Sequence, residues 1–409
     1  MTRSVTLGEM IDTHGGLIQT GPFGSQLHQS DYVESGIPVV MPKDIRDGRV
    51  VEDGIARIME TKAQSLSRHY LKTGSIVFPR RGEISKCAYI DEEHAGLLCG
   101  TGCIKIEPPE DILNPRFLYY YLGLRHVVEW LERNAVGTTM LNLNTKIISG
   151  IKIPEIRKSI QDKIVSILSA YDDLIENNRR RIQLLEQAAR LLYKEWFVHL
   201  RFPGHEHVKI KDGVPEGWEK KTYAALFEFL GGFAFKSKTY LTDGRYGVVT
   251  IKNVHDARFV PECPSRLDAP PEKMKEHCLL KTGDILLSLT GNVGRACIVY
   301  GDNYLLNQRV AKVVGKSGIP ASFVYWTFSN DATQRELENL AYGVAQLNLS
   351  PVKLGERDFI EPPRMILDLF ADTTEPIFSQ ICTLNMQNKQ LEKARDLLLP
   401  KLMNGEVAA

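Results

Sequence analysis

The sequence lacks the features that mark membrane proteins, disulfide-bonded secreted proteins and strongly charged chains. None of its apolar runs approaches the roughly 20 residues that a membrane helix needs. It has seven cysteines, an odd number at wide spacings, and no signal peptide, so we expect reduced thiols, a cytoplasmic location and no membrane partner. The formal net charge is only +1 over 409 residues. That balance neither requires nor excludes nucleic acid, because acidic residues elsewhere can offset a basic patch.

Patterns typical of cofactor sites are also absent. No glycine-rich fingerprint opens a strand–helix unit, so nothing indicates a dinucleotide or S-adenosylmethionine pocket in this chain. Cys99 and Cys103 lack a second ligand pair at zinc spacing. The segment 315–317, Gly-Lys-Ser, resembles the end of a phosphate-binding loop, but Val310 stands where that loop needs its first glycine. We therefore expect this chain to bind no metal and no cofactor.

Two weak matches to catalytic motifs leave an enzymatic alternative open. Asp53, Glu60 and Lys62 have the loose Asp…Glu-x-Lys spacing of metal-dependent nucleases, although the second half of the chain does not repeat them. The segment 114–117, Asn-Pro-Arg-Phe, resembles a motif of adenine methyltransferases but lacks its second proline. Our main hypothesis is a chain without catalytic residues. A self-contained nuclease or methyltransferase is the alternative.

What the sequence does contain is an internal repeat. The segment 71–77, Leu-Lys-Thr-Gly-Ser-Ile-Val, reappears as Leu-Lys-Thr-Gly-Asp-Ile-Leu at 280–286, an offset of 209 residues. Further on, Gly-Thr-Thr-Met-Leu-Asn-Leu at 137–143 matches Gly-Val-Ala-Gln-Leu-Asn-Leu at 343–349, an offset of 206. Turns that arise independently in one α/β protein would not keep such an offset. Two long copies indicate a duplicated domain rather than a solenoid, which needs several short repeats.

Each copy is predicted to be a module with an α+β (mixed α/β) fold and a twisted, largely antiparallel sheet. Short apolar runs between Gly, Pro and Asp turns predict its strands. The predicted elements are strands at 37–41, 75–78, 248–251 and 284–289, and helices near 116–132 and 321–339. The order of the strands within a sheet is not predicted.

A long amphipathic helix follows each module. Residues 160–202 include no Gly or Pro, Ser159 can cap their start, and Pro203 follows their end. Apolar residues recur at alternating spacings of three and four, which is the seam of a coiled coil. The predicted seam residues are Tyr171, Ile175, Asn178, Ile182, Leu185 and Leu192 in the first helix, and Ile381, Leu384, Asn388, Leu391 and Leu398 in the second. Pro376 is predicted to kink or break the second helix near its start.

The two helices are predicted to pair with each other. Asn178 and Asn388 are the single asparagines of these seams, and a buried Asn lowers stability but can fix register. Packing of each helix on its own module is the alternative. The order module, helix, module, helix allows antiparallel pairing, which would hold two similar modules a fixed distance apart. Such a device suits the reading of two separated sites.

Polar side chains suited to DNA contact gather in loops at corresponding places in both modules. Arg reads guanine, and Asn or Gln reads adenine, through paired hydrogen bonds in the major groove. Lys and further Arg hold phosphates. The candidates in the first module are Lys43, Arg46, Arg80, Arg81, Lys86, Thr138, Thr139 and Asn142. The candidates in the second module are Lys236, Lys238, Lys252, Asn253, Thr290, Asn292, Arg295, Gln308, Arg309, Gln346 and Asn348. The two sets differ in detail, as expected if each module reads a different sequence.

Over essentially its whole length the chain resembles the specificity subunit of type I restriction-modification enzymes. Gly-Thr-Thr-Met-Leu-Asn-Leu-Asn at 137–144, followed by Ile-Lys-Ile-Pro at 151–154, resembles the end of a target recognition domain in that family. The stretches that resemble its helical regions and their junctions are 161–197, 201–204, 215–219 and 391–405.

The resemblance implies two tandem target recognition domains, 1–154 and 203–363, separated by an antiparallel coiled coil of a central (155–202) and a distal (364–409) helical spacer region. Each domain would bind one half of a bipartite site in double-stranded DNA, and the helices would set the gap. Two modification subunits would dock along the helices and methylate adenine with S-adenosylmethionine. Restriction subunits that use ATP and Mg²⁺ would join them. This chain would carry no catalytic residue.

The chain departs from that family's pattern at its start. The first module lacks the Pro-x-Gly-Trp segment found at 215–218, so its first strand is not predicted. Recognition loops vary across such a family, so the candidate DNA contacts rest on residue chemistry alone. A coiled-coil scaffold that binds only protein is a further alternative, which salt-dependent, sequence-selective duplex binding would eliminate.

Overall fold

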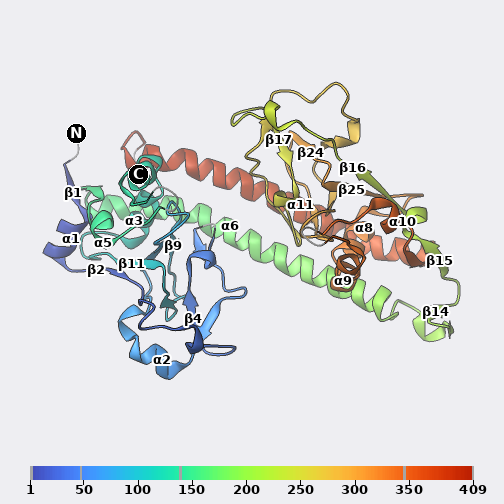
Figure 1. Cartoon of the computed structure of the whole chain (residues 1–409), viewed down its shortest axis with the longest axis horizontal. Helices are drawn as coiled ribbons and strands as arrows, with labels where there is room; N and C mark the ends of the chain where they lie inside the picture. Colours follow the sequence, from blue (N-terminus) through green and yellow to red (C-terminus); the bar gives the residue numbers. More distant parts are fainter. Residues whose placement is uncertain (1–2, 47, 138–140, 344–346, 408–409) are drawn as a thin grey trace. The chain divides into compact units, whose positions relative to one another are not determined.

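The chain forms two compact units (Figure 1). The computed structural model describes residues 3–46, 48–137, 141–343 and 347–407. Unit 1 comprises Met1–Asp173 and Glu392–Ala409, and unit 2 comprises Leu174–Leu391. Each unit therefore contains one copy of the sequence repeat and a segment of each long helix.

Unit 1 is built around an antiparallel sheet in the order β2-β11-β8-β9. β11 pairs with both β2 and β8, and Lys105 lies opposite Gln19 on one side and Val77 on the other. β8 is buried along its whole length and β11 along most of it, which places this pair in the middle of the core. The strands are β2 (Leu17–Thr20), β8 (Ile76–Pro79), β9 (Ala88–Tyr89) and β11 (Cys103–Glu107).

A second sheet of unit 1 has the order β10-β4-β7-β3. Its strands are β3 (Tyr32–Val33), β4 (Ile37–Val40), β7 (Ala56–Ile58) and β10 (Leu98–Cys99). β4 and β10 run parallel, with Val39 beside Leu98. The predicted antiparallel sheet is present, but the sequence did not predict this second sheet or its parallel pair. A short apolar run indicates a buried strand without revealing the direction of its neighbour.

Capping side chains set the helix boundaries in unit 1. Thr6 and Glu9 form a capping box at the start of α1. Asn114 caps α3, and Pro115 occupies the first helical position, where its missing N–H is not needed. α3 packs on the main sheet through Phe117, which is completely buried. The helices are α1 (Leu7–His14), α2 (Glu60–Ser65), α3 (Pro115–Leu122), α4 (Arg125–Asn134) and α5 (Thr145–Ser149).

Unit 2 repeats this plan. Its main sheet has the antiparallel order β16-β25-β22-β23, and its second sheet has the order β20-β17-β24-β21 with β17 and β24 parallel. The strands are β16 (Phe227–Gly231), β17 (Tyr246–Val249), β20 (Arg266–Leu267), β21 (Leu279–Leu280), β22 (Ile285–Ser288), β23 (Ala296–Ile298), β24 (Tyr304–Leu306) and β25 (Val310–Gly315). The helices are α7 (Tyr223–Leu226), α8 (Ala321–Phe328), α9 (Asp331–Leu340) and α10 (Pro351–Gly355). The main sheets match strand for strand, and β10-β4-β7 of the second sheet in unit 1 matches β24-β17-β20 in unit 2, which confirms the duplication.

Short strand pairs close each module. β1 (Ser4–Thr6) pairs with β12 (Lys152–Pro154) in unit 1, and β15 (Glu219–Thr222) pairs with β26 (Asp358–Glu361) in unit 2. The first strand of unit 1, which the sequence did not predict, is thus the counterpart of β15. The other two-stranded ribbons are β5 (Ile45–Arg46) with β6 (Arg49–Val50), β18 (Val254–His255) with β19 (Arg258–Phe259), and β13 (Ile210–Lys211) with β14 (Val214–Pro215).

The two long helices are α6 (Lys158–Tyr193) and α11 (Arg364–Met403). α6 continues as a π-helical turn, Lys194–Val198, and ends before the predicted limit of 202 because Leu200 adopts a left-handed conformation with φ 57°. No helix in the described part of the chain is both long and apolar enough to cross a membrane.

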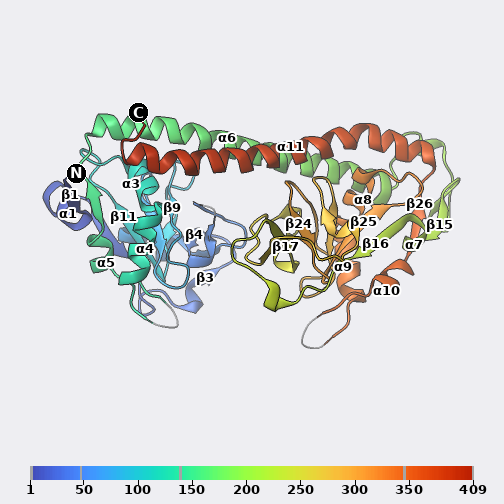
Figure 2. The ribbon, with the colours of Figure 1, turned by 90° about the horizontal axis from the view of Figure 1, so that it is seen from above.

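The long helices pair antiparallel within each unit (Figure 2). In unit 1, Leu168 of α6 shares a core with Leu402 of α11, and Arg395 Nη1 donates to Asp172 Oδ1 at 2.7 Å. In unit 2, Asn178 Nδ2 of α6 donates to Asn388 Oδ1 of α11 at 2.9 Å. Of the predicted seam residues, Ile175, Asn178, Ile381, Leu384 and Asn388 are buried, and Tyr171, Ile182, Leu185, Leu192, Leu391 and Leu398 are half-buried.

The prediction that Pro376 breaks or shortens the second helix was wrong. α11 begins at Arg364 and runs through Pro376 without interruption. Pro376 and Asp372 are both exposed, so water can hydrate the carbonyl group that loses its N–H partner. Phe370 and Phe378 are buried in the core of unit 2 on either side of the proline. This packing holds the helix together across a residue that disfavours it.

Candidate nucleic-acid interface

Three loops of unit 1 converge at one edge of its main sheet. Because β11 is antiparallel to β2 and β8, its start lies beside the ends of those two strands. The segments at this edge are therefore 21–26, 80–84 and 100–102, and the segment 141–142 joins them through an Arg81–Asn142 bridge. We call these four segments the loop edge of unit 1.

Main-chain hydrogen bonds hold this loop edge together. Gly21 N donates to Cys103 O at 2.9 Å, and Arg80 N donates to Gly102 O at 2.6 Å. Gly21 has to be a glycine, because a Cβ atom there would lie 2.0 Å from Gly100 O. The loops are thus fixed to one another and to the sheet.

Three predicted DNA contacts of the first module lie on this loop edge: Arg81 is exposed, and Arg80 and Asn142 are half-buried. Exposed Lys86 lies just beyond it and pairs with Glu83 of the loop edge. The structure thus brings side chains from 80–81 and 142 to one place, although the chain separates them by more than 50 residues.

Lys43 and Arg46 follow β4 in the second sheet and lie in a neighbouring loop. Both side chains are exposed. Lys43 Nζ donates to Gly54 O at 3.4 Å, and Arg46 Nε donates to Lys43 O at 2.9 Å. Gly100 N donates to Val40 O at 3.0 Å, which ties this loop to the loop edge.

Unit 2 has an equivalent loop edge, formed by segments 232–238, 289–292, 307–309 and 347–348. β25 is antiparallel to β16 and β22, so its start lies beside the ends of those two strands. Leu289 N donates to Arg309 O at 3.0 Å, and Gly291 N donates to Leu347 O at 2.9 Å. Thr290 Oγ1 donates to Asn348 Oδ1 at 3.0 Å, at the bridge that corresponds to Arg81–Asn142.

Most predicted DNA contacts of the second module are accessible. Thr290, by contrast, is only 8% exposed, and Asn348 engages its hydroxyl group. Arg295 and Asn348 are half-buried. The exposed candidates are Lys236, Lys238, Lys252, Asn292, Gln308 and Arg309, of which Lys252 lies outside the loop edge, after β17.

Asn253 is a correction. Its side chain is 2% exposed, and its Oδ1 accepts a bond from Thr250 N at 2.9 Å. Its Nδ2 donates to Val260 O at 2.8 Å and to Glu262 O at 3.0 Å. The amide therefore stabilises a turn and has nothing left to offer a base. Thr138, Thr139 and Gln346 lie outside the described residues.

Two exposed aromatic residues on these loops were missed by the sequence analysis. Phe23 is 53% exposed, and Tyr342, next to the Asn348 bridge, is 54% exposed. A cation lies over each ring: the Arg80 guanidinium carbon at 5.9 Å from the Phe23 centroid, and Lys353 Nζ at 5.1 Å from that of Tyr342. The only sequence signal was an aromatic residue between turn formers, Pro-Phe-Gly at 22–24.

Comparison with known proteins identifies the family. The family described as "Type I restriction modification DNA specificity domain" matches residues 5–187 and 215–364, which is most of the chain. The chain belongs to this family. The type I specificity subunit is not catalytic by itself, and its partners are DNA and the other subunits of the restriction-modification system.

Individual members of the family match nearly the whole chain. The MjaIX specificity subunit of Methanocaldococcus jannaschii is 25% identical over 92% of this chain and 88% of its own length. The HindI specificity subunit of Haemophilus influenzae is 22% identical over 89% of this chain and 93% of its own length. The crystal structure of a type I S subunit from M. genitalium shares the fold, with a TM-score of 0.54, 16% identity and coverage of 98% and 96% of the two chains.

Two residues of the segments behind the enzymatic alternative, Lys62 and Asn114, have structural roles in this specificity subunit. Lys62 Nζ pairs with Asp31 at 3.0 Å. Asn114 Oδ1 caps α3, and its Nδ2 donates to Asp162 at 2.8 Å. Burial raises the pKa of the Cys99 thiol to about 12. Among the described residues, no group of three His, Cys, Asp or Glu side chains could hold a metal ion.

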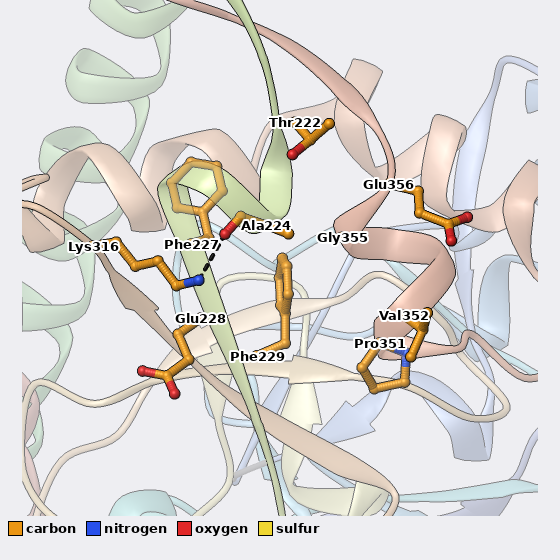
Figure 3. Close-up of a pocket in the computed structure, with 10 residues that line it drawn as sticks. All are labelled: Thr222, Ala224, Phe227, Glu228, Phe229, Lys316, Pro351, Val352, Gly355 and Glu356. Atoms are coloured by element: carbon orange, nitrogen blue, oxygen red, sulfur yellow. Dashed lines mark hydrogen bonds between the residues drawn. The ribbon is translucent and has the colours of Figure 1, made fainter.

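Unit 2 has a shallow pocket of 450 Å³, whose lining residues are drawn in Figure 3. It is lined by the start of β16, by α10 and by Lys316 after the end of β25. Lys316 Nζ donates to Ala224 O at 2.7 Å across its floor. The loop edge lies at the opposite ends of β16 and β25, so this pocket is not part of the candidate interface.

Proposed function

We propose that the loop edge of each unit reads one half of a bipartite DNA site. The paired helices α6 and α11 set the gap between the halves and dock two methyltransferase subunits, which restriction subunits join. The observation that carries this proposal is that corresponding edges of the two units gather polar side chains of different kinds. One frame with two different reading surfaces suits two different half-sites.

The comparison of equivalent positions supports this proposal. Arg81 of unit 1 occupies the bridge position that Thr290 holds in unit 2, and both lie beside an asparagine, Asn142 or Asn348. An exposed arginine offers two parallel donors to guanine, whereas a buried threonine bonded to a half-buried asparagine offers a different pattern. The backbone is therefore kept while the hydrogen-bonding pattern changes.

The chemistry of the complex belongs, in this proposal, to the partner subunits. Methyltransferase subunits would use S-adenosylmethionine, and restriction subunits would use ATP and Mg²⁺. The complex would act on chromosomal and incoming DNA in the cytoplasm.

The test begins with the methylated adenines in DNA from cells that hold this complex, which define the two half-sites. We then expect Arg81→Ala to weaken reading of one half-site and Arg309→Ala to weaken reading of the other, each by about 5- to 150-fold at the contacted base. Binding of duplexes with single base changes measures this. Arg125→Ala, an exposed arginine on α4 paired with Glu129, is the control and should change neither half.

Two results would contradict the proposal. The first is that the purified complex binds duplex DNA without sequence selectivity, or without the steep salt dependence that phosphate contacts produce. Alternatively, both arginine variants could weaken the same half-site, which would place both loop edges on one half.

A further inference from the structure

Phe23 leaves more than half of an apolar side chain exposed to water. Its side chain is 53% exposed, and no other phenylalanine or tryptophan in the described part of the chain is exposed. A ring left in water forgoes the stabilisation that burial provides. The sequence could place a small or polar residue at this position, so a large ring here points to a partner.

The loop that carries Phe23 is well ordered by hydrogen bonds. Gln26 N and Leu27 N donate to Phe23 O at 2.8 and 3.1 Å, and Gln26 Oε1 accepts from Phe23 N at 3.3 Å. Thr101 Oγ1 donates to Pro22 O at 3.0 Å, and Leu27 is buried. The backbone therefore presents the ring in one position, which limits the entropy lost when a ligand binds it.

Arg80 covers one face of this ring. Its guanidinium carbon lies 5.9 Å from the ring centroid, in cation–π geometry. Its Nε is buried without a hydrogen-bond partner among the described residues. More than half of the side chain stays exposed, on the loop edge that also carries Arg81 and Asn142.

We propose that Phe23 contacts the 5-methyl group of a thymine in the major groove of the half-site read by unit 1. This inference rests on the proposed function. The thymine methyl is the apolar feature that the major groove presents, and an aromatic ring contacts it favourably. Insertion between base pairs is the other use of an exposed phenylalanine, but it requires bases against the ring. Arg80 already occupies one of the two faces that an inserted ring would stack.

Unit 2 lacks this ring at the equivalent position. A Cβ atom on Gly21 would lie 2.0 Å from Gly100 O, and one on Gly232 would lie 2.3 Å from Asn307 O, so the same close approach marks both glycines. The residue two positions after this glycine is Phe23 in unit 1 and Ala234 in unit 2. The contact should therefore contribute to one half-site only.

The test uses the assembled complex and its mapped recognition site. Arg81→Ala first identifies the half-site that unit 1 reads. Each thymine of the site is then replaced in turn by uracil, which lacks only the 5-methyl group. At one thymine of that half-site, we expect uracil to weaken wild-type binding about fourfold. Phe23→Ala should bind the thymine duplex about tenfold more weakly than wild type and should no longer distinguish thymine from uracil there.

The controls separate this contact from general effects. The backbone bonds of the loop do not involve the phenyl ring, which contacts Arg80 only weakly, so Phe23→Ala should unfold close to the wild-type denaturant concentration. Met59→Ala removes another exposed apolar side chain of unit 1, 57% exposed at the start of α2, and should leave binding unchanged.

Several outcomes would overturn the proposal. One such outcome is that replacing any thymine of that half-site by uracil leaves wild-type binding unchanged. Another is that Phe23→Ala keeps the wild-type preference for thymine over uracil. Permanganate-reactive thymines that disappear in Phe23→Ala, without any thymine–uracil difference, would identify an inserted wedge instead. A wild-type complex that does not distinguish its mapped site from a scrambled duplex would contradict the proposed function itself.

Discussion

Glu186 of α6 is a buried carboxyl group with few partners. It is 7% exposed, and Tyr325 Oη donates to its Oε1 at 2.8 Å. Its Oε2 has no hydrogen-bond partner among the described residues and lies 3.7 Å from Arg190 Nε. Arg190 also faces Asp256 at 3.3 Å and Asp331 at 3.8 Å. Burial raises the pKa of Glu186 to about 7, although Tyr325 and Arg190 oppose that shift.

This pKa shift makes the stability of unit 2 depend on pH. The folded state holds the proton more tightly than the unfolded state, whose ordinary pKa is 4.5. The stabilisation is therefore complete below pH 4.5 and is lost as the pH rises through about 7. We expect Glu186→Gln, which cannot ionise, to flatten the change in urea midpoint between about pH 5 and 8.

Glu176→Gln provides the matched control for this measurement. Glu176 lies on the same helix with its side chain 37% exposed and pairs with Arg180. Its replacement should leave the pH dependence of the urea midpoint as in wild type. An unchanged slope in Glu186→Gln would show that other groups produce the pH dependence.

At this scale, the sequence predicted residue types better than residue roles. Arg81 and Arg309 are exposed on the loop edges, as their chemistry suggested. Asn253 looked equally suitable, but its amide is consumed by a turn. A sequence shows which groups can bond to a base, whereas burial and competing partners decide which ones remain available.

Asn178 and Asn388 form a buried polar contact between the paired helices. Both side chains are 7% exposed, and each amide is the other's partner. Asn388 is the repeat counterpart of Ile182, one turn away from Asn178. Because the helices run antiparallel, this difference of one turn places Asn178 opposite Asn388. The two asparagines can bond to each other in only one register of the helix pair.

We expect Asn178→Leu alone to destabilise the chain by about 1–3 kcal/mol, because it leaves the Asn388 amide buried without its partner. The double variant Asn178→Leu/Asn388→Leu should recover that loss, since two apolar residues suit the seam. Urea unfolding of the full chain measures both. The double variant should also tolerate more than one gap between half-sites, because its register is less specified.

A double variant less stable than the single one would contradict this account. So would a gap as strict as that of wild type, since the asparagine pair would then play no part in register. Leu184→Asn, on the exposed side of α6, adds an asparagine outside the seam and serves as a control.

At the scale of elements, periodicity predicted both long helices and their seams. The prediction of a helix break at Pro376 was wrong, because buried residues on both sides of the proline outweigh its general tendency to end helices. Strand existence was also predictable, but the parallel pairs β4–β10 and β17–β24 were not. Pairing direction depends on contacts between distant segments, which a local pattern does not contain.

For the whole molecule, α6 is one continuous helix that leaves unit 1 at Asp173 and enters unit 2 at Leu174. Seven inserted residues lengthen a helix by about 10 Å, close to three base pairs of DNA. The helices run antiparallel, and Asn178 faces Asn388. Four residues forward along α6 and four residues back along α11 from this pair, Ile182 and Leu384 occupy matching positions across the seam. A heptad inserted before Ile182 and another after Leu384 should preserve the seam and lengthen the preferred gap by about three base pairs.

Methylated-site mapping measures that gap. A heptad inserted in α6 alone puts the two seams out of step and should abolish assembly. An unchanged gap in the matched double insertion would refute a spacing role for the helices.

The duplication was the most predictable property of the molecule, because a constant offset shows directly in the sequence. The division into units was less visible. Glu392–Ala409, far along the chain, belongs with Met1–Asp173, and Leu402 and Met403 complete a core with Ile164 and Leu168.

This closure by late residues fixes an order of events during synthesis. The ribosome makes the whole of unit 2 by residue 391, while unit 1 still lacks the segment that seals its core. The domain whose translation begins first can therefore complete its core only after all of unit 2 has been made. A chain that ends after residue 391 would contain a complete unit 2 and a unit 1 whose core is incomplete. We expect proteases to cleave the incomplete unit 1 of such a product.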